Sequence, residues 1–205
     1  MIPYEELMEL MRKRRSVRRF SDRPVSIDDI TKLIDAAVQA PSASNRQDWR
    51  FAVVASRERI EQLADAAEKR WASLLADIES DAVSEELGRY ARNFAWFGSA
   101  PALIVITCKK PEGFLCRMLG EDAWAVAGTH ASSSMAAQNF LLAAESLGLA
   151  TCCLTGPLAA SREIKPLLGI GSNRRIVCLI AVGYADETPG PVAREKAAEV
   201  MRMVE

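Results

Sequence analysis

The sequence predicts an α+β protein in which helices pack on a small sheet. Helical apolar periodicity dominates the 205 residues, and only four apolar runs have the length of strands. The β-α alternation is too sparse for a doubly wound nucleotide-binding sheet, and the chain carries neither G-x-G-x-x-G nor G-x-x-x-x-G-K-[ST]. We therefore expect one domain over residues 1–205, because domains usually contain about 100–200 residues.

The N-terminal part of the chain is expected to form two helices. Residues 4–15 place their apolar side chains on one helical face. Ser26, followed three residues later by Asp29, predicts the N-cap of a second helix, which Pro41 ends. The apolar stripe of this second helix consists of Ile30, Leu33, Ile34, Ala37 and Val38.

The remaining elements alternate between helices and short strands. Further helices are expected from Ser56 to about residue 71 or 78, over 123–147, and from Ser161 as N-cap up to Pro166. Residues 135–147 are apolar on nearly every side, which places that helix in the middle of the core, and Gly148 fits its C′ position. The expected strands are 51–55, 102–108, 150–154 and 176–183.

Composition excludes several classes of function. The 26 basic and 27 acidic side chains leave a net charge of −1, so bulk charge does not attract a polyanion, and nucleic acid is not an expected partner. No apolar run approaches the 18 or more residues that cross a bilayer, so no membrane partner is expected. The N-terminus lacks the apolar stretch of a signal peptide.

The cysteines indicate a reducing, cytoplasmic location, because their number is odd and no C-x-x-C is present. His130 is the only histidine, so no metal site is expected. Cys116 lies in a loop and is expected to be the most accessible thiol. The cysteines expected to be buried and unreactive in strands are Cys108, Cys152, Cys153 and Cys178.

A basic run is the first feature that points to a site. Six of the eight residues from 12 to 19 are basic, and Ser16 lies among them. From composition alone the run is a solvated helix end, a nucleic-acid patch or a phosphate pocket, and the neutral overall charge disfavours nucleic acid. Arginine offers paired donors to a phosphate, and a serine hydroxyl adds a neutral one.

Four segments form a recognisable series. They are R-R-S-V-R-R-F (14–20), A-P-S-A-S-N-R-Q-D-W-R-F (40–51), A-A-Q-N-F-L-L-A-A with L-G-L (136–144 and 147–149), and I-A-V-G-Y (180–184). In this order and at these separations the series resembles the nitroreductase family of flavin-dependent oxidoreductases. The resemblance extends over about residues 12–200, except for 68–122, which corresponds to a variable cap or insert in the family.

The resemblance implies an α-β-α sandwich with a mixed, mainly antiparallel sheet, in an interlocked homodimer with two FMN sites at the interface. The residues that match the holders of the FMN phosphate and ribityl chain are Arg14, Arg15, Ser16 and Arg18, with Arg194 returning to the phosphate from the C-terminal part. The residues that match the loop contacting the partner subunit's flavin are Pro41, Ser42, Ala43, Asn45 and Gln47. Thr155 and Gly156 match the turn whose backbone N–H groups face flavin N5.

The implied activity is that of an NAD(P)H-dependent FMN oxidoreductase with ping-pong turnover. Hydride would pass through flavin N5 to a small organic acceptor such as a nitro compound, a quinone or an enone, and no side chain need act as a nucleophile. Two alternatives remain open. One is a relative with other flavin chemistry, namely dehalogenation, heterocycle oxidation or flavin fragmentation, and the other is a flavin-binding sensor without turnover.

Two features complete the expectations. Asp48 stands where the family usually has proline, which adds a negative charge, and Arg46 is expected to pair with it. The tail, residues 184–205, has too little apolar surface to fold on itself, so we expect it to wrap the partner subunit. Its apolar side chains are Val192, Val200, Met201, Met203 and Val204.

Overall fold

The computed structural model describes residues 1–78, 87–88, 94–110 and 125–204. Cys116 and much of the expected insert at 68–122 therefore lie outside the described residues. The elements are α1 (Tyr4–Lys13), α2 (Ile27–Ala37), η1 (Ala43–Asn45), β1 (Arg50–Val54), α3 (Arg57–Ala76), η2 (Trp96–Ser99), β2 (Ala102–Lys109), α6 (Ala125–Ser146), β3 (Ala150–Leu154), η3 (Gly156–Ala160), α7 (Ser161–Leu167), β4 (Arg174–Gly183) and α8 (Ala197–Val200).

The four strands form one sheet in the order β1-β2-β4-β3, and each neighbouring pair is antiparallel. Within the described residues, one isolated parallel bridge joins Ser16, which lies in no strand, to Thr151 of β3. The four strands themselves pair only in antiparallel fashion, whereas a mixed sheet was expected. Its two edges are β1 and β3, so whatever packs beside β3 meets an open row of backbone groups.

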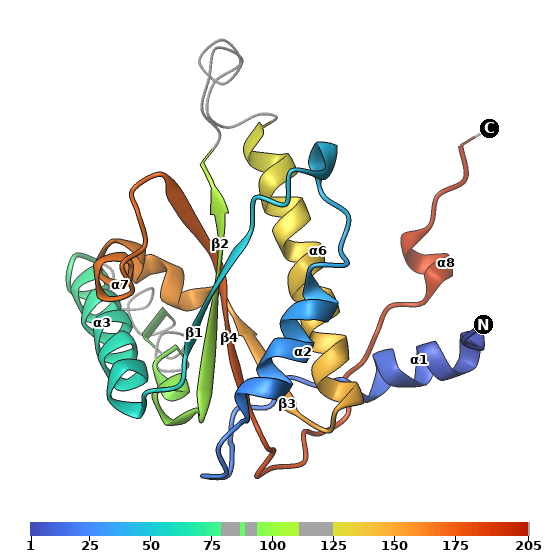
Figure 1. The fold of residues 1–205 in the computed structure, drawn as a ribbon, viewed down its shortest axis with the longest axis horizontal. Coiled ribbons are helices and arrows are strands. Elements are labelled where there is room, and N and C mark those ends of the chain that lie inside the picture. The colour runs from blue at the N-terminus through green and yellow to red at the C-terminus, as the bar shows by residue number, and fades with distance from the viewer. Residues whose placement is uncertain (79–86, 89–93, 111–124, 205) are drawn as a thin grey trace.

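The sheet lies between two helical layers, as the α-β-α expectation required (Figure 1). α2 and α6 cover one face, and α3 and α7 cover the other. Successive side chains of a strand point to opposite faces, so Ile104 and Ile106 join the core under α6 while Leu103 and Val105 join the core under α3. Burial on both faces explains why β2 and β4 are continuous apolar runs.

The helix ends test the expected caps. The Ser26 hydroxyl accepts a hydrogen bond from the Asp29 N–H at 3.0 Å, which confirms the N-cap of α2. Gly148 has φ +72°, which confirms the left-handed residue after α6. The expected cap at Ser161 is wrong by one residue. Ala160 occupies the N-cap position, and Pro166 lies within the last turn of α7.

α6 is covered on one side only, which corrects the expectation that it lies in the middle of the core. Phe140 and Ala144 are fully buried against the sheet and α2. On the opposite side Met135 is 41% exposed and Gln138 is also exposed, and Leu147 at the helix end is 43% exposed. Its uniformly apolar composition therefore leaves an open face in the single chain.

α1 and the tail project from the body of the molecule (Figure 1). No residue of α1 is buried, and Tyr4 is 69% exposed. Residues 192–204 are exposed throughout. A ten-residue helix is shorter than the roughly 12–15 residues that an isolated helix needs in water, so α1 requires a packing partner.

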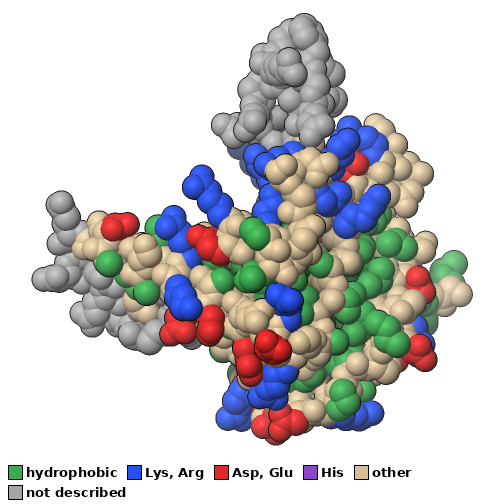
Figure 2. All heavy atoms as spheres, turned by 60° about the vertical axis from the view of Figure 1, so that its left-hand side comes forward, with side chains coloured by type: hydrophobic (Ala, Val, Ile, Leu, Met, Phe, Trp, Pro, Cys, Tyr) green, Lys and Arg blue, Asp and Glu red, His purple; other side chains and the backbone are tan. Residues whose placement is uncertain are grey.

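Arg174 ties the basic end of the sheet to the segment that precedes β1. Its guanidinium donates to the Thr107 hydroxyl at 2.8 Å and to the Asp48 carbonyl at 2.6 Å. Figure 2 shows further Lys and Arg side chains gathered near this end, where Lys109 pairs in register with Arg174. Among the described helices, none combines the length and apolar character of a membrane span.

Candidate functional site

The expected site residues separate into two groups at opposite ends of α6 (Figure 1). Near the C-terminal end, the charge of Glu145 acts on Lys13 at the start of the basic run. Nearer the N-terminal end, Ser132 accepts a hydrogen bond from the Ala43 N–H at 3.1 Å. Ser132 and Glu145 are 13 positions apart along the helix, which corresponds to about 20 Å. One chain therefore does not bring the basic run and the loop 41–47 together.

The arginine segment, residues 14–19, lies along the edge of β3. The Val17 N–H donates to the Thr151 carbonyl at 3.0 Å, and Ser16 forms the parallel bridge to the same residue. The Val17 side chain is only 5% exposed and anchors the segment. An open strand edge thus fixes the backbone on which the cationic side chains stand.

Two of the arginines converge on β3. Burial raises the pKa of the Cys152 thiol, and the charges of Arg18 and Arg14 both oppose that rise. The Ser16 side chain also opposes the rise in this pKa. Arg14, Ser16 and Arg18 therefore lie around the same part of the strand, where together they form a donor set suited to an anion.

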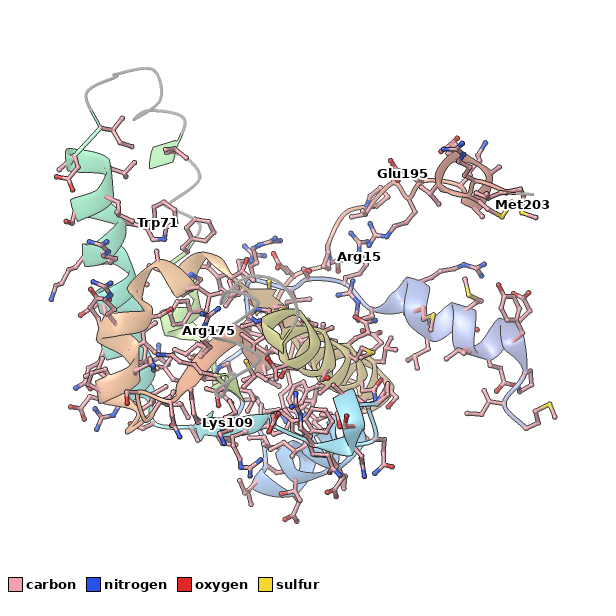
Figure 3. All side chains as sticks on the ribbon, turned by 90° about the horizontal axis from the view of Figure 1, so that it is seen from above. Arg15, Trp71, Lys109, Arg175, Glu195 and Met203 are labelled. Atoms are coloured by element: carbon pink, nitrogen blue, oxygen red, sulfur yellow. The ribbon has the colours of Figure 1, made fainter. Side chains whose placement is uncertain are left out.

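Arg15 serves a different contact. Its guanidinium donates to the Gly190 carbonyl, and Figure 3 shows Arg15 beside the beginning of the tail rather than on β3. Arg194 is exposed on the tail and donates to the adjacent Ala193 carbonyl at 3.1 Å. In the single chain, neither residue joins the group formed by Arg14, Ser16 and Arg18.

Glu187 holds the arginine segment from the other side, and the sequence carried no motif that would have identified it. One carboxylate oxygen accepts from the backbone N–H groups of Arg18 at 2.5 Å and Arg19 at 3.2 Å. The bond from the Arg18 N–H is the main reason that the pKa of Glu187 lies below its ordinary value. Glu187 therefore fixes the backbone direction at Arg18.

The loop 41–47 is shaped by left-handed backbone at residues other than glycine. Ser44 and Asn45 have φ 52°, and Gln47 has φ 49°. The Ser42 hydroxyl accepts from the Gln47 N–H at 3.1 Å, and the Gln47 amide donates to the Asn45 side-chain oxygen at 3.1 Å. Such a conformation persists where its surroundings enforce it and is common at binding sites.

Contacts from Asp48 and from Ser132 of α6 fix the loop, while several of its side chains remain exposed. Arg46 pairs with Asp48 at 3.3 Å, as expected from the sequence. Pro41, Asn45 and Gln47 are exposed, and Ser132 fixes the loop from α6. The loop therefore presents amide and apolar groups to whatever lies beyond this chain.

Thr155 and Gly156 form the turn directly after β3, the strand beside which the arginine segment lies. Thr155 is exposed and precedes η3. The Gly156 carbonyl accepts from the Trp71 indole at 3.0 Å, and a Cβ at Gly156 would lie 1.9 Å from the Phe94 ring (Figure 3 labels Trp71). Only glycine fits this close approach, so the aromatic pair fixes the path of the turn.

The cysteine expectations are confirmed at three positions and wrong at one. Cys108, Cys152 and Cys178 are buried. Cys153 is exposed on β3, which is an edge strand of the sheet. The sequence of β3, an apolar run of five residues, did not indicate that the strand lies at an edge of the sheet.

Comparison with known proteins shows which sequences and folds this chain resembles. Residues 11–184 match the profile described as the Nitroreductase family. A candidate NADH dehydrogenase/NAD(P)H nitroreductase of Archaeoglobus fulgidus is 31% identical over 182 residues, which are 88% of this chain and 86% of that protein. A BluB-like flavoprotein of Clostridium difficile 630 superposes with a TM-score of 0.83 at 27% identity, over 97% of this chain and 99% of that one. Oxidised iodotyrosine deiodinase bound to FMN and 3-iodo-L-tyrosine gives 0.73 at 26%, over 93% and 95%.

The Glu187 contact predicts a pH-dependent stability difference. A carboxylate whose pKa is lowered by folding stabilises the protein above its ordinary pKa of about 4.3, and that stabilisation disappears as the pH falls through the lowered value. Glu187→Gln should therefore be less stable than the parent at pH 7, and the two free energies of unfolding should converge below about pH 4. Denaturant unfolding at both pH values measures this. A difference that does not change with pH would rule out the charged contact.

Proposed function

Because the chain belongs to the nitroreductase family, we propose that it is an NAD(P)H-dependent FMN oxidoreductase with ping-pong turnover. The observation that carries the proposal is the convergence of Arg14, Ser16 and Arg18 on β3, one strand-length from the turn at Thr155. FMN bound there would supply the redox chemistry, namely hydride transfer from NAD(P)H to an organic acceptor.

The donor set fits the polar part of FMN. A phosphomonoester requires several charged donors, which the guanidinium groups of Arg14 and Arg18 provide, and the Ser16 hydroxyl adds a neutral one. Glu187 is already bonded to the backbone at Arg18, which orients that residue without occupying its side chain. Arg15 holds the start of the tail, from which Arg194 would return to the phosphate.

The other end of β3 fits the flavin ring. Thr155 would direct its backbone N–H toward N5, and Gly156 holds the turn in place against Phe94 and Trp71. These residues bind and orient, and no side chain is assigned to a covalent step. A small acceptor such as a nitro compound, a quinone or an enone would follow the nicotinamide into the same place.

A second copy of the chain is proposed to complete each site. The loop 41–47 lies about 20 Å along α6 from the arginine segment, so it would reach the flavin of the partner subunit. Three unsatisfied surfaces support a homodimer: α1 with no buried residue, the open face of α6, and the tail. Covering all three would bury more than the roughly 2,000 Å² typical of obligate interfaces.

Reductive dehalogenation is a second candidate activity. Iodotyrosine deiodinase bound to 3-iodo-L-tyrosine resembles this chain over 93% of its length. Both activities would use the same flavin and the same donor residues, so the acceptor distinguishes them.

An anaerobic spectrum tests the proposed function. The purified protein should show flavin absorbance, which NADH or NADPH should bleach. A nitroaromatic, a quinone or an iodophenol added next should restore the oxidised spectrum, and the compound that does so identifies the acceptor class. A protein that binds FMN but resists bleaching by both nicotinamides would be a flavin-binding sensor, and the proposed enzyme activity would be wrong.

The phosphate donors are tested by substitution. Arg18→Ala removes one charged hydrogen bond, which should weaken FMN binding by about 10- to 150-fold, or roughly 1.5–3 kcal/mol. Riboflavin lacks the phosphate and should bind parent and variant equally. The matched control is Arg12→Ala, because Arg12 belongs to the same basic run but pairs with Glu5 on α1. Flavin titration that finds parental FMN affinity in Arg18→Ala would contradict the phosphate site.

A further inference from the structure

Two thiols meet across the strands β3 and β4. Cys153 lies opposite Ile180 in the register, and Cys178 is two residues away along β4, so their side chains are diagonal neighbours on the same face of the sheet. Cys153 is exposed, whereas Cys178 is buried in the core under α6. Reagents can therefore reach the Cys153 thiol directly, whereas the buried Cys178 thiol is accessible to them only through Cys153.

The two thiols interact, and their pKa values move in opposite directions. The hydrogen bond from the Cys178 thiol lowers the pKa of Cys153, and the charge of Arg14 lowers it further. The same contact raises the pKa of Cys178, which stays protonated and acts as the donor. Cys153 is therefore the nucleophile of the pair, since the thiolate is the reactive form.

The other described cysteines lack this arrangement. Cys152 belongs to the core on the opposite face of the sheet, and Cys108 is buried under α6. Burial raises the pKa of both thiols. Neither is exposed, so both should react slowly.

Cys153 also lies within the proposed flavin site. Alternate residues of a strand share one face, which places Cys153 between Thr151, where the arginine segment is bridged, and Thr155 at the turn. Arg14 acts on this thiol as well as on Cys152. A flavin extending from the arginine segment to the turn would cover Cys153. This step rests on the proposed function.

We propose that Cys153 and Cys178 form a peroxide-reactive dithiol that becomes accessible when the flavin site is empty. The Cys153 thiolate attacks one oxygen of a hydroperoxide, the O–O bond breaks, and the leaving alkoxide or hydroxide takes up a proton. The resulting sulfenic acid is attacked by the Cys178 sulfur, so that an S–S bond forms while the S–O bond breaks. The hydroxyl departs as water with the proton of Cys178.

The strand position allows the bond to close. Diagonal neighbours in a sheet have Cα atoms about 7–8 Å apart, slightly beyond the usual disulfide span of about 4.4–6.8 Å. Within the sheet β3 pairs only with β4, and the arginine segment on its other side is bonded at Thr151, two residues before Cys153. Closing the bond therefore requires β3 to shift near Cys153. The disulfide would then replace the exposed Cys153 thiol in the flavin-free site.

Peptide mapping by mass spectrometry tests the dithiol. The full-length protein, freed of flavin, is treated with hydrogen peroxide and then blocked with an alkylating reagent. We expect one linked peptide pair, Cys153 with Cys178, that is lighter by two hydrogen atoms. Cys108→Ala is the matched control and should behave as the parent. Absence of the linked pair in the flavin-free parent, or equally fast oxidation of Cys108 or Cys152, would overturn the proposal.

Two variants separate the steps. Cys178→Ala should stop at the sulfenic acid, which dimedone then labels at Cys153, whereas Cys153→Ser should give neither product. Unlabelled Cys153 in a folded Cys178→Ala variant would contradict the order of the steps. If the Cys178→Ala variant does not fold, the presence or absence of the linked Cys153–Cys178 peptide in the parent is sufficient to test the proposal.

The rate of disulfide formation is finally compared with and without bound FMN. With FMN at about 100 times its Kd, only about one chain in a hundred is flavin-free, so disulfide formation should slow by about 100-fold. Equal rates with and without bound FMN would overturn the flavin dependence while leaving the FMN site intact. No FMN binding at all would refute the proposed function and the flavin dependence together, and the flavin-free sample would still decide the dithiol.

Discussion

The arrangement of the site depends on how the open edge of β3 is closed. The Val17 N–H donates a hydrogen bond to the Thr151 carbonyl, and this contact fixes the basic run alongside an edge strand of the sheet. Glu187 fixes the same segment from the start of the tail that follows β4, so two distant parts of the chain hold it. Without this pairing the arginines would be the solvated end of α1. With it, Arg14 and Arg18 converge on one part of the sheet.

The same geometry supports the proposal that a second copy completes the site. α6 separates the arginine segment from the loop 41–47, and the helix leaves Met135 exposed on the side away from the sheet. The proposed phosphate-binding residues and the proposed ring-contacting loop are therefore too far apart to meet within one chain. A helix without buried residues, an open apolar face and an extended tail are costly in water, and a second copy would cover all three.

Local signals in the sequence predicted the elements well. The strand 150–154 was found as expected, since Gly148 and the turn at Thr155 bound it clearly, and the cap at Ser26 followed from side-chain chemistry. Features set by distant contacts were not predictable. The exposure of Cys153 is linked to the position of its strand at the edge of the sheet. The hydrogen bond from the Arg18 N–H to Glu187 joins residues that are 169 positions apart. The open face of α6 depends on what packs against it from outside the chain.

Complementation between two inactive variants would show whether the arginine segment and the loop 41–47 meet across a dimer interface. One variant carries Arg14→Ala and Arg18→Ala, the other carries Asn45→Ala and Gln47→Ala, and neither should bind FMN well alone. After unfolding and refolding as an equal mixture, half of the dimers are mixed, and each mixed dimer has one intact site. The account predicts that FMN binding returns to about a quarter of the parental sites. A mixture that binds no more FMN than the separate variants would show that the two halves do not meet across an interface.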